Sequence, residues 1–472
     1  MTNRRNVNLQ GRLSFAAAGF AHGIIQNGID WFLLLYYSQV LGLSAYLTGV
    51  ALAIALGIDA ISDPLVGRWS DRHQSALGRR HPFLYAAILP ASLFFYLIWA
   101  PPFELTSQSH LFVYLLVMIV ALRLSMTVFF VPMYAMVPEL TTDYDERTAL
   151  VNWRMSSNYF FGGLMSIAMY GIWLADTPEY PDGILRADGY VEAGIVGGAL
   201  ILVGMLFAAA GTHREIPRLR KTPKKKTESA RGLLAEYWET LADKSILALV
   251  LYSIISSVAN GSAEALWVYV QSYYWEFTSE QIAWMVSAQL LAPLFAFVLT
   301  PAFSNRRDKK TVLIWSSVAS VVGYGWPLLL RSLGLFMSND NPLLFPLILV
   351  NAAVTTIFDI IVYTVGYSMM ADVVEARQLE TGRREEGLLS SFQLFSQKAF
   401  SGMGILVGGF FLEWISFPTQ VESADVPAET VFDLGLVYGP VFMVIYLASL
   451  APLVLYRINR KTHLENLAKL SE

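Results

Sequence analysis

About twelve segments of this 472-residue chain are apolar and long enough to cross the ~30 Å hydrocarbon core of a bilayer. Hydrophobic residues make up 55% of the chain and charged residues 15%, which excludes an ordinary soluble globular protein. The short alternating segments of a transmembrane barrel do not occur, so the spans are predicted to be helices. The predicted spans cover residues 13–40, 46–69, 81–100, 110–138, 148–174, 191–211, 245–273, 280–302, 311–333, 343–371, 388–412 and 432–456.

Lysine and arginine fall almost entirely on one side of this predicted topology. With the N-terminus inside, the inner segments hold 28 of the 33 basic residues, whereas the outer loops hold Arg186 and Arg331. Basic residues concentrate on the cytoplasmic side of membrane proteins. We therefore expect both termini to be cytoplasmic in a multi-pass protein of the plasma membrane, which is the inner membrane in a bacterium.

A long polar connection, residues 212–244, divides the predicted spans into two blocks of six. The blocks cover residues 1–211 and 245–457, and residues 458–472 form a predicted cytoplasmic tail. Two six-helix blocks related as parallel repeats are the architecture of the major facilitator fold. The sequence therefore predicts an all-helical integral membrane protein of that fold.

Asp59 and Asp63 are the only charged residues of the second predicted span before Arg68. Their spacing puts both carboxylates on one face of a helix. A charge near the bilayer centre costs about 3 kcal/mol or more, and like charges on adjacent turns also repel each other. The pair indicates either a site for a coupling cation or carboxylates neutralised by lysine or arginine from another helix. Intramembrane carboxylates are usually functional, which favours the cation site.

Acidic and basic residues recur together in corresponding predicted inner loops of both blocks. We interpret them as a cytoplasmic gate, in which salt bridges hold the blocks together when the cavity faces outward and separate when it faces inward. Ordinary surface charge is the alternative. The residues are Asp71, Arg72, Arg79, Arg80, Glu139, Asp143, Glu146 and Arg147 in the first block, and Arg306, Arg307, Asp372, Glu375, Arg383 and Arg384 in the second.

Four motifs in these helices and loops occur in a recognisable order. They are Asp59-Ala60-Ile61-Ser62-Asp63-Pro64, Leu77-Gly78-Arg79-Arg80, Val137-Pro138-Glu139-Leu140 and Ala371-Asp372-Val373. The chain resembles, from about residue 12 to residue 455, the glycoside–pentoside–hexuronide:cation symporters, which include the melibiose permeases. The resemblance implies cation-coupled transport of a sugar, glycoside or uronide.

The resemblance also implies a cation site. Two aspartates in the second helix of the melibiose permeases bind Na⁺, Li⁺ or H⁺, and they match Asp59 and Asp63. Ser62 stands where those proteins have an asparagine, and Thr127 matches a threonine that completes the site. The implied coupling ion is Na⁺ or H⁺, and no other cofactor is implied.

The family's sugar-binding carboxylates are missing. Gly23 and Phe130 occupy the positions of two aspartates that hold galactosyl hydroxyls, whereas Tyr134 stands where a tryptophan stacks on the sugar. Asp30 follows Gly23 by seven residues, and it is either a relocated polar contact or a residue near the outer mouth. We therefore expect a substrate that is not bound in the galactoside manner.

Other polar side chains within the predicted spans are candidates for substrate contacts. Lys398 matches a family lysine beside the cation and sugar sites, and Arg154 lies near a family arginine that touches the sugar. A lysine at mid-span needs a carboxylate partner, and the helix-II aspartate pair is suited to it. Arg123 likewise requires a carboxylate or a water-filled cavity. Interhelical hydrogen bonds are the alternative for the remaining candidates. These are His22, Asn27, Asp359, Gln393 and Gln397.

Together these features predict a secondary active transporter that works by alternating access. A carrier of a lysolipid is the alternative, because animal lysophospholipid symporters share the aspartate pair and would not need the sugar carboxylates. A non-transporting membrane sensor is a further possibility. An enzyme is not expected, since the chain lacks the spacing of nucleophile–base pairs, metal sites and phosphate-binding loops. We expect a monomer in the lipid bilayer that binds a small molecule, for which a sugar is the first candidate, and no nucleic acid.

Overall fold

The computed structural model describes residues 7–102, 107–141, 143–216, 243–304, 307–381 and 386–471. Every regular element in these residues is a helix, as the sequence predicts. Helices lie at all the predicted span positions, and nine helices of the described part are long and apolar enough to cross a membrane. Helices suit a bilayer because they satisfy their backbone N–H and C=O groups internally.

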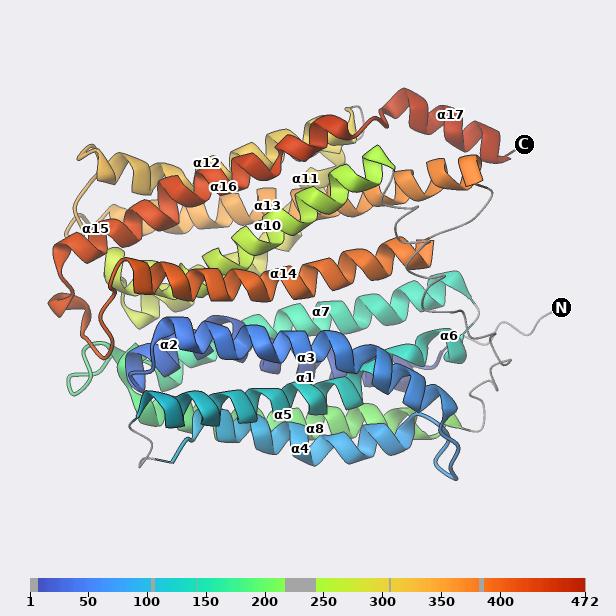
Figure 1. The fold of residues 1–472 in the computed structure, drawn as a ribbon, viewed down its shortest axis with the longest axis horizontal. Helices are drawn as coiled ribbons and strands as arrows, with labels where there is room; N and C mark the ends of the chain where they lie inside the picture. Colours follow the sequence, from blue (N-terminus) through green and yellow to red (C-terminus); the bar gives the residue numbers. More distant parts are fainter. Residues whose placement is uncertain are drawn as a thin grey trace. The chain divides into compact units, whose positions relative to one another are not determined.

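Figure 1 labels the main helices. The elements of the first half are α1 (Leu9–Asn27), η1 (Gly28–Phe32), α2 (Leu33–Leu35), η2 (Tyr36–Val40), α3 (Ala45–Arg72), α4 (His81–Trp99), α5 (Gln108–Ala135), α6 (Val137–Leu140), α7 (Tyr144–Ala168), η3 (Met169–Trp173), η4 (Gly183–Leu185) and α8 (Ala187–His213). The elements of the second half are α10 (Lys244–Tyr269), η6 (Val270–Tyr274), α11 (Ser279–Ser304), α12 (Lys309–Ser332), α13 (Leu344–Thr381), α14 (Glu386–Trp414), η7 (Ser423–Asp425), α15 (Ala428–Leu436), η8 (Val437–Val441), α16 (Phe442–Ser449), η9 (Ala451–Leu455) and α17 (Arg460–Ser471).

The chain forms two compact units, and each collects segments that are separate in the sequence. Unit 1 comprises Met1–Lys224, Thr278–Ser287 and Leu412–Val426, and unit 2 comprises Lys225–Phe277, Ala288–Phe411 and Pro427–Glu472. Two short segments of the second predicted block therefore belong to unit 1. Most of the predicted connection, residues 217–242, lies outside the described residues.

Polar residues mark the starts of several helices. The side chain of Asn8 accepts a hydrogen bond from the backbone N–H of Gly11 at 2.8 Å, at the start of α1. Asp243 accepts from two backbone N–H groups at 2.8 and 2.9 Å, at the start of α10. Ser44 and Ser107 cap α3 and α5 in the same way. These caps satisfy N–H groups that the first turn of a helix leaves without partners.

Glycines of α1 allow this helix to lie against α7 at close range. A Cβ at Gly19 would lie 2.1 Å from the backbone oxygen of Arg154, and a Cβ at Gly23 would lie 2.2 Å from that of Asn158. Small residues one turn apart are a common contact between membrane helices. The contact fixes the backbone of α7 beside α1. It therefore also fixes the positions from which the side chains of Arg154 and Asn158 extend.

Gly23→Ala is therefore expected to lower the stability of the protein by about 1–3 kcal/mol, because the added methyl group overlaps a backbone oxygen. Gly57→Ala is the matched control, since a Cβ there has nothing within 4 Å. Alanine is the better helix former by up to ~1 kcal/mol, so this control is expected to leave stability unchanged or raise it. Thermal unfolding of the detergent-purified variants measures the difference, and equal unfolding temperatures would contradict the close contact.

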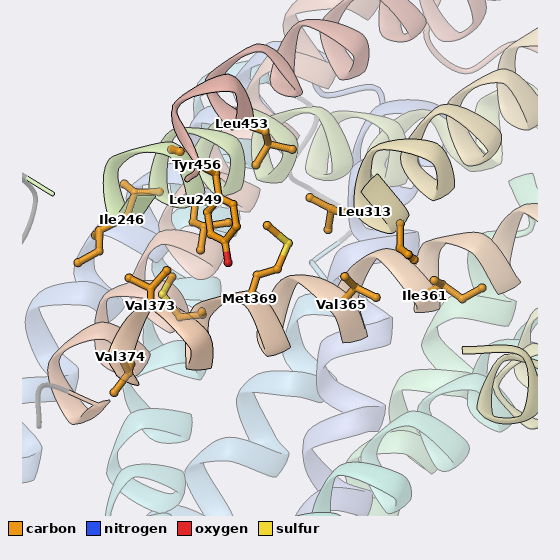
Figure 2. Packing of buried hydrophobic residues seen from close by; sticks show 14 residues of the cluster. Ile246, Leu249, Leu313, Ile361, Val365, Met369, Val373, Val374, Leu453 and Tyr456 are labelled. Atoms are coloured by element: carbon orange, nitrogen blue, oxygen red, sulfur yellow. The ribbon is translucent and has the colours of Figure 1, made fainter. Parts of the chain in front are cut away.

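An apolar core in unit 2 joins α10, α12, α13, η9 and the residue that follows η9. Figure 2 shows its side chains converging, among them Ile246, Leu249, Leu313, Ile361, Val365, Met369, Val373 and Leu453. The ring of Tyr456 is part of this core, and the residue is only 3% exposed. The core thereby holds the polar end of α13 beside the segment that leads into α17.

The predicted tail, residues 458–472, contains the helix α17. Asn459 caps this helix by accepting a hydrogen bond from the backbone N–H of Thr462 at 2.9 Å. The backbone N–H of Arg460 donates to Asp308 at 2.8 Å, which ties the start of α17 to the start of α12. The helix also packs against α13, so in unit 2 the tail is a docked element.

Candidate functional site

Two aspartates of α3 and a threonine of α5 meet at one point inside unit 1. Thr127 Oγ1 lies 2.9 Å from Asp59 Oδ1 and 2.8 Å from Asp63 Oδ1. Ser62 Oγ lies 3.3 Å from the same threonine oxygen and donates to the backbone carbonyl of Asp59 at 3.2 Å. Asp59 is 6% exposed and Thr127 is 3% exposed. The structure thus brings the four predicted cation ligands together and screens most of them from solvent.

Thr127 cannot serve both carboxylates with one hydroxyl group. Its single hydrogen is donated to one carboxylate oxygen at a time. In the other contact, two acceptor oxygens face each other, and a cation or a proton between them would replace that repulsion with attraction. Hard cations take oxygen ligands such as carboxylates and hydroxyls. The arrangement is therefore chemically suited to bind a small cation.

Arg123 supplies a positive charge at the edge of this site. Its Nη1 lies 3.6 Å from Asp59 Oδ2, and its side chain is 13% exposed. It precedes Thr127 by four residues, so both side chains leave the same face of α5. Arg123 was expected to need a carboxylate or a water-filled cavity, and the structure gives it the carboxylate of Asp59. Lys398, the predicted partner of the aspartate pair, lies in α14 among residues whose side chains the structure does not describe.

A second polar group lies where α1, α5 and α7 meet. His22 Nδ1 lies 3.2 Å from the hydroxyl of Tyr134 and 3.1 Å from Nδ2 of Asn158. The guanidinium carbon of Arg154 lies 4.1 Å from the centre of the Tyr134 ring. Three predicted substrate residues, His22, Tyr134 and Arg154, are therefore brought together. Asn158 was not predicted, although it follows Arg154 by four residues and so shares its face of α7.

The two positions that lack the family's aspartates are occupied by close packing. Gly23 leaves no room for a side chain, because a Cβ there would meet the backbone oxygen of Asn158 at 2.2 Å. The ring of Phe130 lies 4.6 Å from that of His22 and stacks on Tyr134 at 5.7 Å between ring centres. This side of the polar group is thus an aromatic wall without a carboxylate.

Asp30 lies in the π-helical segment η1, where the helix is not regular. It accepts a hydrogen bond from Gln26 and lies within electrostatic range of Arg123. The 3.6-residue period that related Asp30 to Gly23 in the sequence does not apply across a π turn. Such turns often occur at functional sites, but the sequence shows no signal for this one.

Two further predicted substrate residues each form at least one hydrogen bond to a neighbouring helix, and Asn27 also bonds to its own helix. In unit 1, Asn27 donates to the carbonyl of Gly23 at 3.1 Å and accepts from Ser166 at 3.3 Å. In unit 2, both oxygens of Asp359 accept hydrogen bonds from α12, one from Ser320 and the other from a tyrosine hydroxyl at 2.8 Å. These contacts agree with the interhelical alternative. The predicted residues of α14 whose side chains are not described are Gln393 and Gln397.

The predicted gate residues of unit 1 form ion pairs within that unit. Glu139 Oε1 forms ion pairs with Arg79 at 2.8 Å and with Arg80 at 2.9 Å. Arg80 also pairs with Asp71 and donates to the hydroxyl of Ser70 at 2.6 Å. This cluster ties the end of α3 and the start of α4 to α6.

The other gate residues of unit 1 lie around the start of α7. Glu146 pairs with Arg12 of α1 at 2.6 Å. Asp143 accepts from the backbone N–H of Glu146 at 3.2 Å, and Arg147 donates to a backbone carbonyl of the preceding loop at 3.0 Å. Arg72, at the end of α3, is exposed.

The predicted gate residues of unit 2 gather at the ends of α12 and α13. Lys309 Nζ donates to both carboxylate oxygens of Asp372, at 2.6 and 2.8 Å. His463 Nδ1 of α17 lies 3.4 Å from Asp372 and 3.4 Å from Glu375. Arg307 is exposed. The predicted gate residues outside the described part are Arg306, Arg383 and Arg384.

Two aspartates in the loop between α7 and α8 were not predicted as functional residues. Asp176 accepts hydrogen bonds from the backbone N–H and the hydroxyl of Ser279, at 2.9 and 2.8 Å. Asp182 accepts from the same two groups of Ser423, at 2.6 and 2.9 Å. Both pairs join segments that are distant in sequence, and they hold residues of Thr278–Ser287 and Leu412–Val426 in unit 1. No pattern in the sequence pairs these residues.

Residues 14–460 match the family described as MFS/sugar transport protein. The chain is similar to a putative glycoside/cation symporter, YagG, of Escherichia coli (strain K12), with 25% identity over 459 residues that cover 95% of this chain and 92% of that protein. It is also similar to sodium-dependent lysophosphatidylcholine symporter 1 of Gallus gallus, with 23% identity over 495 residues that cover 98% and 89%. A bacterial homologue of the human lysosomal transporter Spinster, at 13% identity, has the same fold with a TM-score of 0.61 over 98% of this chain and 97% of that one. The chain therefore belongs to the MFS/sugar transport protein family, and it is a membrane transporter of the major facilitator fold, not an enzyme.

Proposed function

We propose that this protein is a symporter that couples the transport of a sugar, glycoside or uronide to the entry of Na⁺ or H⁺. The observation that carries the proposal is the convergence of Asp59 and Asp63 on the single hydroxyl of Thr127. Two carboxylates in an apolar helix are costly unless a positive charge joins them. A coupling cation at this point explains both the cost and the geometry.

The cation and the substrate are coupled because each favours the state that binds the other. In this proposal, a bound cation neutralises the aspartate pair and loosens the hold of Arg123 on Asp59. The coupling free energy is reciprocal, so substrate binding tightens cation binding by the same factor. Lys398 provides a further positive charge that stands in for an absent cation.

The proposed substrate contacts centre on the group formed by His22, Tyr134, Arg154 and Asn158. An aromatic face, an imidazole, a guanidinium and an amide offer stacking and hydrogen bonds to a hydroxyl-rich ligand. The similarity to a relative named as a glycoside/cation symporter supports a sugar as the substrate class. Further proposed contacts are Asn27, Asp30, Asp359, Gln393, Gln397 and Lys398.

Both termini are proposed to lie in the cytoplasm, where 28 of the 33 basic residues would then be found. The clusters around Glu139 and Asp372 would lie on that side, and their residues are proposed to act as a cytoplasmic gate, although the ion pairs described above lie within each unit. In this proposal, some of these charged residues exchange their partners within a unit for partners in the other half as access alternates.

Uptake of labelled sugars into vesicles that contain the purified protein tests the function. The panel covers galactosides, glucosides, xylosides and uronides, each with an inward Na⁺ gradient, an inward H⁺ gradient or neither. We expect at least one sugar class to accumulate above equilibrium under one gradient, and the accumulation to vanish when an ionophore collapses that gradient. Gradient-independent equilibration alone would show a facilitator instead of a symporter. Protein-free vesicles provide the control.

A lysolipid is the second candidate substrate, and a specific observation favours it. The galactosyl-binding aspartate positions hold Gly23 and Phe130, so that part of the site is tightly packed and aromatic. A relative named as a lysophosphatidylcholine symporter matches 98% of the chain. The same vesicles, loaded with a labelled lysophospholipid in place of the sugars, decide between the two. Gradient-driven movement of the lysolipid without movement of any sugar would select this candidate.

A further inference from the structure

Three metal-ligating side chains converge at the end of α13, far in sequence from the aspartate pair of α3. Asp372 and Glu375 lie one turn apart on α13, and His463 reaches them from α17. One donor atom of each residue lies within 4.8 Å of the others. The side chains are 6%, 33% and 20% exposed, so the cluster is mostly covered by protein.

Two of these potential metal-ligating atoms lack the hydrogen bonds that buried polar atoms normally make. Among the described residues, neither Glu375 Oε2 nor His463 Nδ1 has a hydrogen-bond partner, although both are sealed from solvent. They lie 3.4 Å apart. The hydroxyl of Tyr456 is a third such atom, in a residue that is 3% exposed, and it lies within electrostatic range of Asp372. Figure 2 shows the Tyr456 ring between side chains of α10 and α13.

Contacts within the protein hold the start of the helix that carries His463. Asn459 caps α17 at 2.9 Å from the backbone nitrogen of Thr462, and Asp308 accepts from the backbone N–H of Arg460 at 2.8 Å. His463 lies one turn into this fixed helix. A site whose ligands are already positioned loses little conformational entropy on binding.

We propose that Asp372, Glu375 and His463 form a binding site for a divalent transition-metal ion, with zinc as the representative, that ties α17 to the end of α13. One imidazole nitrogen with two carboxylates is a ligand set for zinc and its first-row neighbours, whereas magnesium and calcium take oxygen ligands alone. Metal bound here satisfies the two atoms that lack partners. Lys309 now supplies the positive charge beside Asp372, and its side chain is 31% exposed, so its ammonium group is able to turn into solvent when the metal takes its place.

Zinc titration of the full-length protein, purified in detergent and stripped with a chelator, tests this proposal. Calorimetry is expected to show one saturable zinc site, and zinc is expected to raise the thermal unfolding temperature. His463→Ala and Glu375→Gln should each lower the zinc affinity of this site by at least about tenfold. Mutating a residue that only supports a metal ligand already lowers metal affinity by about this factor. His463→Cys should keep it, because a thiolate also binds zinc, and the chain has no other cysteine.

The matched control is His110→Ala, which removes an exposed histidine from another part of the chain. It should bind zinc as the wild type does, and millimolar Mg²⁺ should not compete with zinc at the site. Zinc binding that is equal in His463→Ala and the wild type would place the metal elsewhere and overturn the proposal. An unfolding temperature that does not respond to zinc would overturn it too.

Discussion

Asp63→Asn is expected to abolish the gradient-driven accumulation of substrate while leaving the protein folded. The change keeps the shape of the side chain and one oxygen near Thr127, but it removes one of the two negative charges. A unit charge about 4 Å from a cation contributes about 4 kcal/mol at an effective dielectric constant of 20. Asp63 is partly exposed, so we expect a loss in cation affinity of roughly a hundredfold or more.

Two measurements check this prediction. Binding of radioactive Na⁺ to the purified protein, and its competition by H⁺, reports the cation site without any substrate. Uptake into vesicles under the effective gradient reports coupling, and the variant is expected to reach only the equilibrium level of substrate. Passive exchange of substrate across the membrane should survive, since the substrate contacts remain.

The matched control is Asp340→Asn, the same chemical change at an exposed position. It should bind the cation and accumulate substrate as the wild type does. Cation-driven accumulation by Asp63→Asn at the wild-type level would show that the aspartate pair is not the coupling site. Loss of both binding and passive exchange in that variant would point to misfolding, which its unfolding temperature would reveal.

The helical spans could be predicted from the sequence because hydropathy and helix length are local properties. The cost of a buried charge is local too, so Asp59 and Asp63 stand out in the second span from the sequence alone. That Thr127 lies beside these two aspartates was predicted only through the family resemblance. The spacing of Arg123 and Thr127 by four residues is visible in the sequence, but it does not show which helix their common face meets.

Other contacts could not be predicted because they depend on how distant segments meet. Asp176 and Asp182 lie in the loop between α7 and α8, whose acidic sequence resembles ordinary surface, yet they bind serines that follow them by 103 and 241 residues. The docking of His463 on α13 is of the same kind. The π turn at Asp30 is local, but π turns have no clear sequence signature, so the sequence could not show that the regular helical period is interrupted there.

Arg123→Gln is expected to raise the affinity of the empty protein for the coupling cation by about tenfold or more. The guanidinium group lies 3.6 Å from Asp59, so it competes with a cation for the same carboxylate. Without this guanidinium group, no positive charge from Arg123 offsets the two carboxylates, and a bound cation interacts with their full negative charge. The Arg123→Lys variant keeps the positive charge, and its affinity should stay close to that of the wild type.

The same Na⁺ binding and uptake assays measure the effect. The matched control is Arg186→Gln, which removes an arginine that precedes α8 and pairs with Glu192 at 3.4 Å. The coupling should weaken in Arg123→Gln even though the cation binds more tightly. This expectation follows from the proposed coupling, in which Arg123 binds Asp59 when the cation is absent and substrate binding favours the state in which Arg123 has released it. Without that competitor, the cation is bound whether or not substrate is present, so substrate should no longer increase cation affinity as strongly. Unchanged or weaker cation binding in Arg123→Gln would show that Arg123 supports the site instead of competing for it.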